Sequence, residues 1–363
     1  PVFVGLDIHR HWVHVAVLGG AGKQPRHDRI PNTREALGAW AASTLRRTRR
    51  GVSCACEAGP SSIALARILN GYARMRCIVV APTRVARQRR GRVKTDARDA
   101  ERLAELLRAD ALVRVSCPGE EEEALRRLSR AREVLRRDAL RARQRLRDFA
   151  EGGEPHGSAG GPGSESGPCE QPDAVAVMHL ERAATTRETE LEAITSDLCA
   201  AGFACSVWSP RVRALRCFRG IETLTAVSLV AELHGIVRFP SPRSLMAYVG
   251  LVPREHSSGQ RIRRGGITKS GNAQARRFLV QAAWHHRHPP RVGASLRQRR
   301  RGQPEPLVTL ADRAQRRLHE RYIYLTERRG LPKKKVIIAV ARELTGFIWS
   351  ALKWVDEHQT GAS

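Results

Sequence analysis

Two aspartates, Asp96 and Asp99, lie three residues apart directly behind a strongly basic stretch, in "GRVKTDARDAERLAEL". This i, i+3 spacing places both carboxylates on one face of a helix. One interpretation is local: Asp96 is the N-cap, and Asp99 completes a capping box at the positive end of the helix dipole. The other interpretation is that the two carboxylates bind a divalent cation.

Two further carboxylates lie in or at the end of apolar runs that are expected to be buried strands. Asp7 lies inside the apolar run "VFVGLDI", and Glu57 ends the run "VSCACE". A charge in a buried strand is unfavourable unless it is paired or used. Carboxylates converging from two strands and one helix form a hard-oxygen site suited to Mg²⁺, and two such ions can assist phosphodiester chemistry. Taken singly, Glu57 also fits a solvent-facing strand end and Asp7 a polar residue near a turn.

The first 115 residues must supply the elements that position these carboxylates. Residues 2–8 and 12–18 read as two short strands joined by a tight connection, which predicts a hairpin. Further along, the pattern predicts strands at residues 52–57 and 76–82 and helices at residues 61–73 and 96–108, with Ser61 or Ser62 as the first cap. Strands alternating with helices indicate an α/β domain over residues 1–115.

A different pattern begins near residue 119, and we expect a helical hairpin over residues 116–209. Residues 119–150 predict a long, exposed, arginine-rich helix that pairs with another helix. Its thin apolar stripe consists of Leu125, Leu128, Val134 or Leu135, and Leu146. Residues 152–172 are rich in Gly, Ser and Pro and predict a mobile loop, after which residues 173–201 resume helical character. The loop looks long for a coiled-coil tip.

The last part, residues 210–363, is expected to be mostly α-helical. Residues 254–272 predict a polar, glycine-punctuated loop that feeds a helix, and residues 290–306 predict a basic loop. The chain ends in a strongly apolar helix around residues 336–354. The histidine-rich "WHHRHPP" at residues 284–290 is interpreted as a polar helix end broken by prolines, because metal-ligand spacing is missing.

The excess of positive charge indicates the kind of partner that the protein binds. Lys plus Arg number 64 against 36 Asp plus Glu, giving a formal net charge of +28. Self-repulsion opposes such an imbalance, whereas a polyanion compensates it, and arginine suits phosphate. Nucleic acid is therefore the expected partner. An arginine-rich proteome would explain part of the excess, although it would not suppress acidic residues.

Cysteine usage and hydropathy bear on the compartment. The 8 cysteines form no CxxC pair, which favours free thiols in a reducing compartment over a zinc module. No apolar run approaches the roughly 18 residues of a membrane span, and the start of the chain shows no signal-peptide pattern. We therefore expect a cytoplasmic protein without a membrane partner.

Basic side chains lie in two segments: directly before Asp96, and in and after the glycine-punctuated loop at residues 254–272. The residues that would place phosphates near the carboxylates are Arg84, Arg87, Arg89, Arg90, Arg92 and Lys94. The residues expected to contact the DNA backbone in the later segment are Arg254, Arg261, Arg263, Arg264, Lys269, Asn272, Arg276 and Arg277. The alternatives are a solvated basic loop for the first set and a capped, solvent-facing basic helix for the end of the second.

Four segments together resemble one known family. They are "VGLDIHRHWVHVAV", "CEAGPSS", "VVAPTRVARQRRGRVKTDARDAERLAELL" and "GLVPREHSSGQRIRRGGITKSGNAQARRFLVQAA". In this order they resemble the DEDD insertion-sequence transposases of the IS110 family, which includes the Piv invertases. The resemblance implies an α/β RuvC-like (RNase H-like) N-terminal domain, a coiled-coil middle and a C-terminal transposase domain. It also implies that Asp7, Glu57, Asp96 and Asp99 bind Mg²⁺, as two ions.

The loop "REHSSGQRIRRGG" has two readings. From chemistry alone it is a phosphate-binding loop whose hydroxyls only donate hydrogen bonds, because serine is a poor nucleophile without activation. The resemblance instead implies that Ser258, directly before a glycine, attacks DNA and forms a phosphoserine link, with Ser257 as the alternative. It further implies a composite site between subunits of a dimer or tetramer, and a structured bridge RNA that pairs with donor and target DNA.

These observations predict an RNA-guided recombinase of an insertion sequence, acting in the bacterial cytoplasm and on the nucleoid. Energy kept in the serine–DNA bond would make ATP unnecessary, in agreement with the lack of a Walker A motif. Two alternatives stay open. One is a RuvC-type metal-dependent nuclease or junction resolvase that uses water as nucleophile. The other is an inactive nucleic-acid-binding protein.

Overall fold

The computed structural model describes residues 1–19, 24–59, 61–81, 95–152, 170–258 and 261–359. The chain divides into two compact units, residues 1–117 and 118–363. The second unit contains both the long helical hairpin and the helical body that follows it. The predicted division of this unit near residue 210 stays a prediction.

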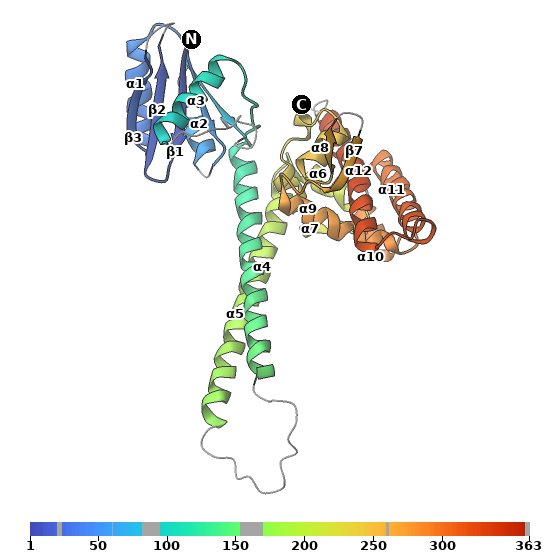
Figure 1. Ribbon diagram of the computed structural model, residues 1–363. Helices are drawn as coiled ribbons and strands as arrows, with labels where there is room; N and C mark the ends of the chain where they lie inside the picture. Colours follow the sequence, from blue (N-terminus) through green and yellow to red (C-terminus); the bar gives the residue numbers. More distant parts are fainter. Residues whose placement is uncertain (20–23, 60, 82–94, 153–169, 259–260, 360–363) are drawn as a thin grey trace. The chain divides into compact units, whose positions relative to one another are not determined.

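The first unit is built on a mixed five-stranded sheet with the order β3-β2-β1-β4-β5 (Figure 1). The strands are β1 (Val2–Ile8), β2 (Trp12–Leu18), β3 (Arg26–Pro31), β4 (Val52–Glu57) and β5 (Met75–Val80). The first three strands pair antiparallel, whereas β4 lies parallel to β1 and β5 parallel to β4. The predicted hairpin of residues 2–8 and 12–18 is confirmed.

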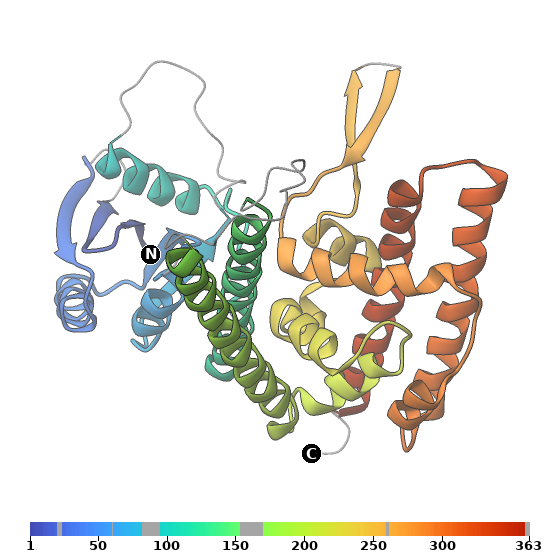
Figure 2. The same ribbon diagram turned by 90° about the horizontal axis from the view of Figure 1, so that it is seen from below.

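Helices cover both faces of this sheet. On one face α1 (Arg34–Arg47) and α2 (Ser62–Asn70) close an apolar core that includes Val4 and Leu6 of β1. On the other face α3 (Asp96–Arg108) packs against β1 and β2, and Figure 2 shows the sheet between the two helical layers. This α/β region agrees with the RuvC-like start that the resemblance implies.

The second unit begins with two long helices, α4 (Glu120–Gly152) and α5 (Glu170–Ala204), which pack side by side as the predicted helical hairpin (Figure 1). Along α4, Leu125 is buried, whereas Val134 is 55% exposed, so the apolar stripe runs through Leu135. Helix α5 begins three residues earlier than predicted. Residues 153–169, which make up most of the predicted mobile loop, lie outside the described residues.

Most of the remaining helices of this unit share one apolar core. They are α6 (Ser209–Arg216), α7 (Thr223–Leu233), α8 (Pro242–Tyr248), α9 (Ala273–Ala283), α11 (Glu305–Ile323) and α12 (Lys333–Gln359). A further short helix, α10 (Ala294–Arg300), contributes no residue to this core. The buried face of α12, from Val336 to Val355, lies in that core, as the apolar end of the sequence predicted. In the part of the chain that the structure describes, no helix is long and apolar enough to cross a membrane.

Two predictions for this unit are wrong. Residues 254–272 were expected to form a loop, but most of them form the antiparallel strands β6 (Pro253–Ser258) and β7 (Arg261–Ile267). Pairing between the strands satisfies backbone groups that a loop would leave to water. The predicted basic loop at residues 290–306 contains helix α10, whose Leu296 is buried. The histidine-rich segment does begin as the end of a helix, the short helical turn Trp284–Arg287, which stops before the prolines.

Candidate catalytic site

The register of the central strands brings Asp7 and Glu57 to neighbouring positions. Leu6 pairs with Cys56 across the parallel strands β1 and β4, so the next positions along them are Asp7 and Glu57. On the other side of β1, Asp7 pairs with His14 of β2. Residues paired across strands share a face of the sheet, so these side chains belong to one face.

Gly5 brings helix α3 onto the same face. A Cβ atom on Gly5 would lie 1.8 Å from the carbonyl oxygen of Ala100 and 2.7 Å from the amide nitrogen of Ala104. Only glycine permits this close approach of helix and strand. Asp7 follows Gly5 by two residues and therefore lies on the face that α3 covers. The strand aspartate thus meets the beginning of α3, where Asp96 lies.

The local interpretation of Asp96 as a helix cap is wrong. The N-cap of α3 is Thr95, and its side chain makes no capping hydrogen bond. Asp96 is therefore the first helical residue and Asp99 the fourth, so a capping box between them does not form. The carboxylate of Asp96 instead approaches two histidines: its Oδ2 lies 3.3 Å from Nε2 of His9 and 3.5 Å from Nε2 of His14.

His9 joins the two aspartates that the fold brings together. Its Nε2 lies 3.0 Å from Oδ2 of Asp7 as well as 3.3 Å from Oδ2 of Asp96. One ligand atom from each of Asp7, His9 and Asp96 lies within 4.8 Å of the others. The side chains are 22%, 46% and 46% exposed, respectively, so the group is open to a substrate.

The backbone around His9 is held in place. The His9 amide donates to the carbonyl of Trp12 at 2.8 Å, and Nδ2 of Asn32 donates to the His9 carbonyl at 2.8 Å. The sequence analysis missed this residue, although it contained a signal. In "LDIH" the histidine follows the strand aspartate by two residues, which is the period that keeps side chains on one face of a strand.

The donor set fits a divalent ion. Carboxylate oxygens suit Mg²⁺ and Mn²⁺, and an imidazole nitrogen suits the more polarisable transition metals. Among the described residues Glu57 and Asp99 lie outside the group of three, with Glu57 exposed at the end of β4 and Asp99 half-buried in the first turns of α3. The fold therefore brings Asp7 and Asp96 together around His9, with Glu57 on the strand next to Asp7 and Asp99 one turn after Asp96.

Ser257 and Ser258 end strand β6 in the second unit. The strand register pairs Ser258 with Arg261 and Ser257 with Ile262. Arg263 and Arg264 follow on β7, opposite His256 and Glu255. The side chains of residues 255–264 lie outside the described part, so the serine, Arg261, Arg263 and Arg264 are placed by their backbone alone.

The other predicted phosphate contacts fall into three groups. The first set, Arg84, Arg87, Arg89, Arg90, Arg92 and Lys94, lies outside the described residues. Arg254 and Lys269 are exposed on the hairpin and its return, as a DNA contact requires. Asn272, Arg276 and Arg277 instead bond to protein groups, and their contact with DNA stays a prediction.

Comparison with known proteins identifies the class. A DEDD-type IS110 family profile described as "Transposase" matches residues 4–153, and one described as "Transposase IS116/IS110/IS902 family" matches residues 212–296. The chain is 38% identical over 294 residues to the protein named "Putative transposase y4qE" of Sinorhizobium fredii, covering 81% of this chain and 73% of that one. It is 28% identical over 351 residues to the transposase for insertion sequence element IS1533 of Leptospira borgpetersenii, covering 93% and 99%.

These matches and the mixed sheet with its carboxylates define a DNA transposase. The chain belongs to the IS110 family of DEDD transposases.

Proposed function

We propose that this transposase cuts and rejoins DNA through a covalent serine–DNA intermediate, with Ser258 as nucleophile. The hydroxyl oxygen of Ser258 bonds to phosphorus, the bond from phosphorus to one deoxyribose oxygen breaks, and the serine proton leaves to that oxygen or to water. Attack by a second DNA strand reverses the step and frees the serine. The phosphodiester energy is retained, so the reaction needs no ATP.

The observation that carries the metal-assisted part of the proposal is the approach of Asp7 and Asp96 from a strand and a helix far apart in sequence. Both carboxylates lie within about 3.3 Å of His9 Nε2. Two carboxylates this close repel each other unless a cation lies between them. Two Mg²⁺ ions would be held by the four carboxylates of Asp7, Glu57, Asp96 and Asp99. When bound, such ions neutralise phosphate charge and lower the pKa of an attacking hydroxyl.

Charge and family membership support the partners that we propose. A net charge of +28 is suited to two DNA molecules and a structured RNA at once. We propose donor and target DNA as substrates and a bridge RNA, encoded by the element, as the reader of sequence. We also propose that the protein acts as a dimer or tetramer, in the cytoplasm and on the nucleoid. The exposed Arg254 and Lys269 would contact the phosphate backbone.

A covalent-trapping experiment tests the nucleophile. Purified protein with its co-purified RNA is mixed with labelled donor DNA and Mg²⁺, denatured, and examined for a protein-linked label. Wild type and Ser257→Ala are expected to carry the label, whereas Ser258→Ala and Asp7→Asn are not. Label on Ser258→Ala but not on Ser257→Ala would move the nucleophile to Ser257.

A RuvC-type nuclease is the second candidate, because the carboxylate–histidine group forms within the first unit without any serine. In that case water attacks the phosphate, Ser258→Ala cuts at the wild-type rate, and no protein-linked label forms. An inactive nucleic-acid-binding protein would bind RNA and DNA, but neither the wild type nor Asp7→Asn would cut DNA.

A further inference from the structure

The β6–β7 hairpin leaves and rejoins the helical body through a closed neck, formed by Tyr248, Gly250, Gly271 and Asn272. The amide of Asn272 donates to the carbonyl of Tyr248 at 2.9 Å. The amide of Lys269 donates to the carbonyl of Gly250 at 3.2 Å. The chain that leaves α8 is therefore bonded to the chain that enters α9. Contacts that fix this neck therefore also fix the first residues of β6, the strand that ends in Ser258.

Both neck glycines are required by geometry. Gly250 has φ +68°, and a Cβ there would lie 2.1 Å from the carbonyl oxygen of Ser270. Gly271 has φ +75°, and a Cβ there would lie 2.0 Å from the carbonyl oxygen of Tyr248. Arg276 fastens the same place, because its Nη1 donates to the carbonyls of Val249 at 2.9 Å and Ser270 at 3.2 Å.

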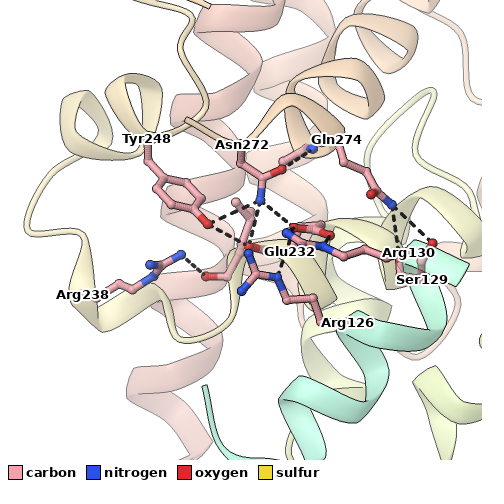
Figure 3. Close-up of polar contacts among 10 residues, drawn as sticks. Arg126, Ser129, Arg130, Glu232, Arg238, Tyr248, Asn272 and Gln274 are labelled. Atoms are coloured by element: carbon pink, nitrogen blue, oxygen red, sulfur yellow. Dashed lines mark hydrogen bonds and ion pairs between the residues drawn. The ribbon is translucent and has the colours of Figure 1, made fainter. Parts of the chain in front are cut away.

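A fully buried carboxylate, Glu232 at the end of α7, lies beneath the neck (Figure 3). Nδ2 of Asn272 donates to its Oε2 at 2.6 Å, while Oδ1 of Asn272 caps α9 by accepting from the amide of Ala275 at 3.0 Å. The Tyr248 hydroxyl donates to the backbone carbonyl of Glu232 at 3.3 Å. Two of the four neck residues thus bond to Glu232.

The same carboxylate is held from the other side by helix α4. Arg130 donates to it through Nε at 2.9 Å and Nη2 at 3.2 Å, and Arg126 donates through Nε at 3.3 Å (Figure 3). Burial alone would raise the pKa of Glu232, but the bonds from Arg130 and Asn272 outweigh it and lower the pKa. The group stays ionised, so it cannot lose one partner without leaving a buried charge unpaired.

Two further polar contacts extend the link along α4. Nε2 of Gln274 donates to the Ser129 hydroxyl at 3.2 Å. Nη2 of Arg277 donates to Oε2 of Glu133, a nearly buried carboxylate, at 2.6 Å. Residues 126, 130 and 133 are spaced i, i+4, i+7, so one face of α4 meets both Glu232 of α7 and, through Glu133, the first turns of α9. Shape alone would not fix this register, whereas a row of paired polar groups does.

We propose that Glu232 is a positioning residue: it locks the root of the serine hairpin to α4, so that the long helical hairpin sets where Ser258 lies. The inference rests on the proposed role of Ser258. It explains why Asn272, Arg276 and Arg277, predicted as DNA contacts, bond to protein groups. A shift of the hairpin root moves the serine oxygen relative to the phosphate, which slows attack without removing any reacting group.

The test compares Glu232→Gln, which keeps shape but loses charge, with Glu343→Gln. Glu343 of α12 also bonds to two arginines, Arg317 and Arg321, but belongs to no part of the neck. Single-turnover formation of the labelled protein–DNA adduct is measured at saturating DNA, together with DNA affinity. Glu232→Gln is expected to slow the adduct roughly tenfold to a hundredfold with unchanged affinity, and Glu343→Gln to react like wild type.

A swap variant and hydrogen exchange separate positioning from loss of folding. In the double variant Glu232→Gln/Asn272→Asp the amide and the carboxylate trade places, so the bond to the neck reforms and the adduct rate is expected to recover. Amide exchange in residues 253–267 should rise in Glu232→Gln and fall back in the swap. If Glu232→Gln does not fold, Arg130→Gln, which weakens the link from the half-exposed α4 side, is measured in its place.

The outcomes are distinct. Adduct formation at the wild-type rate in Glu232→Gln, with none in Ser258→Ala, overturns the positioning role and leaves the serine mechanism standing. A slow Glu232→Gln that the swap does not rescue, with hydrogen exchange unchanged in the hairpin, also overturns it. Adduct formation by Ser258→Ala instead contradicts Ser258 as the nucleophile, which is the part of the proposed function on which this inference rests.

Discussion

Gly5 of β1 and Ala100 of α3 face each other with no room for a side chain between strand and helix. A methyl group on Gly5 would lie 1.8 Å from the Ala100 carbonyl oxygen, far inside contact distance. This contact determines how close the start of α3 comes to Asp7. The distance between Asp7 and Asp96 thus depends on a residue that has no chemistry of its own.

Replacing Gly5 by alanine should therefore disturb the site although every carboxylate remains. The helix must move away from the sheet, at a cost of about 1–3 kcal/mol by analogy with overpacked cores. We expect a lower melting temperature of the first unit, weaker metal binding and slower DNA cutting. Gly51→Ala is the matched control, because its new methyl group would meet the carbonyl oxygen of Arg74 at an ordinary 3.6 Å. Wild-type metal affinity in Gly5→Ala would contradict the prediction.

His9 is expected to contribute to metal affinity. Removing its imidazole takes away a nitrogen that lies 3.0 Å from Asp7 and 3.3 Å from Asp96. His9→Ala should weaken Mn²⁺ binding by about tenfold, as measured by calorimetry or electron paramagnetic resonance on the metal alone. The exposed His11, two residues on in the same turn, supplies the control His11→Ala. Equal Mn²⁺ affinity in the two variants would remove His9 from the site.

Buried histidines should make the second unit sensitive to mild acid. His286 is 1% exposed, and burial, followed by the charges of Arg219 and neighbouring histidines, lowers its pKa from 6.5 to about 3. Between these values the unfolded chain binds a proton that the folded chain does not. The free energy of unfolding is therefore unaffected by this histidine above pH 6.5. It falls as the pH drops toward 3, by up to about 1.4 kcal/mol per pH unit for each such histidine.

The measurement is the melting temperature between pH 7 and pH 4.5. His286→Leu should flatten the curve, leaving the share due to His234, whose pKa is also lowered to about 3, chiefly by burial. The exposed His179 of α5 supplies the control His179→Gln, which should leave the curve as in wild type. An unchanged slope in His286→Leu would show that folding does not lower the pKa of His286.

Lys269 and Arg276 should behave differently toward DNA. Lys269 is exposed and adopts φ 54°, a conformation that asparagine tolerates, so Lys269→Asn removes the charge without strain. The slope of log affinity against log salt should fall by about 0.9 if this lysine contacts one phosphate. Arg276→Gln should instead lower the melting temperature, because it loses two bonds, to the carbonyls of Val249 and Ser270 beside the neck. An unchanged salt slope in Lys269→Asn would exclude the phosphate contact.

Several elements were predictable because their pattern of apolar and polar residues follows which side chains are buried. The runs at residues 2–8, 12–18 and 52–57 are apolar enough to read as strands, and helix α3 begins and ends where its pattern does. By contrast, β3 reads "RHDRIP", a polar segment that becomes a strand only through pairing with β2 at the edge of the sheet. The hairpin of β6 and β7 was mistaken for a loop for a similar reason, since its arginines and glycines give no strand pattern.

The sequence by itself determined the types of group available: acids in an apolar strand and at the start of a helix, a serine beside a glycine, and a large excess of arginine. Tertiary structure alone decided that His9 lies between Asp7 and Asp96, and that Asn272 bonds to Glu232. Spacing along the chain reports which face of an element is buried. Distances between elements depend on how closely they pack, and here on a missing side chain at Gly5 and a buried charge at Glu232.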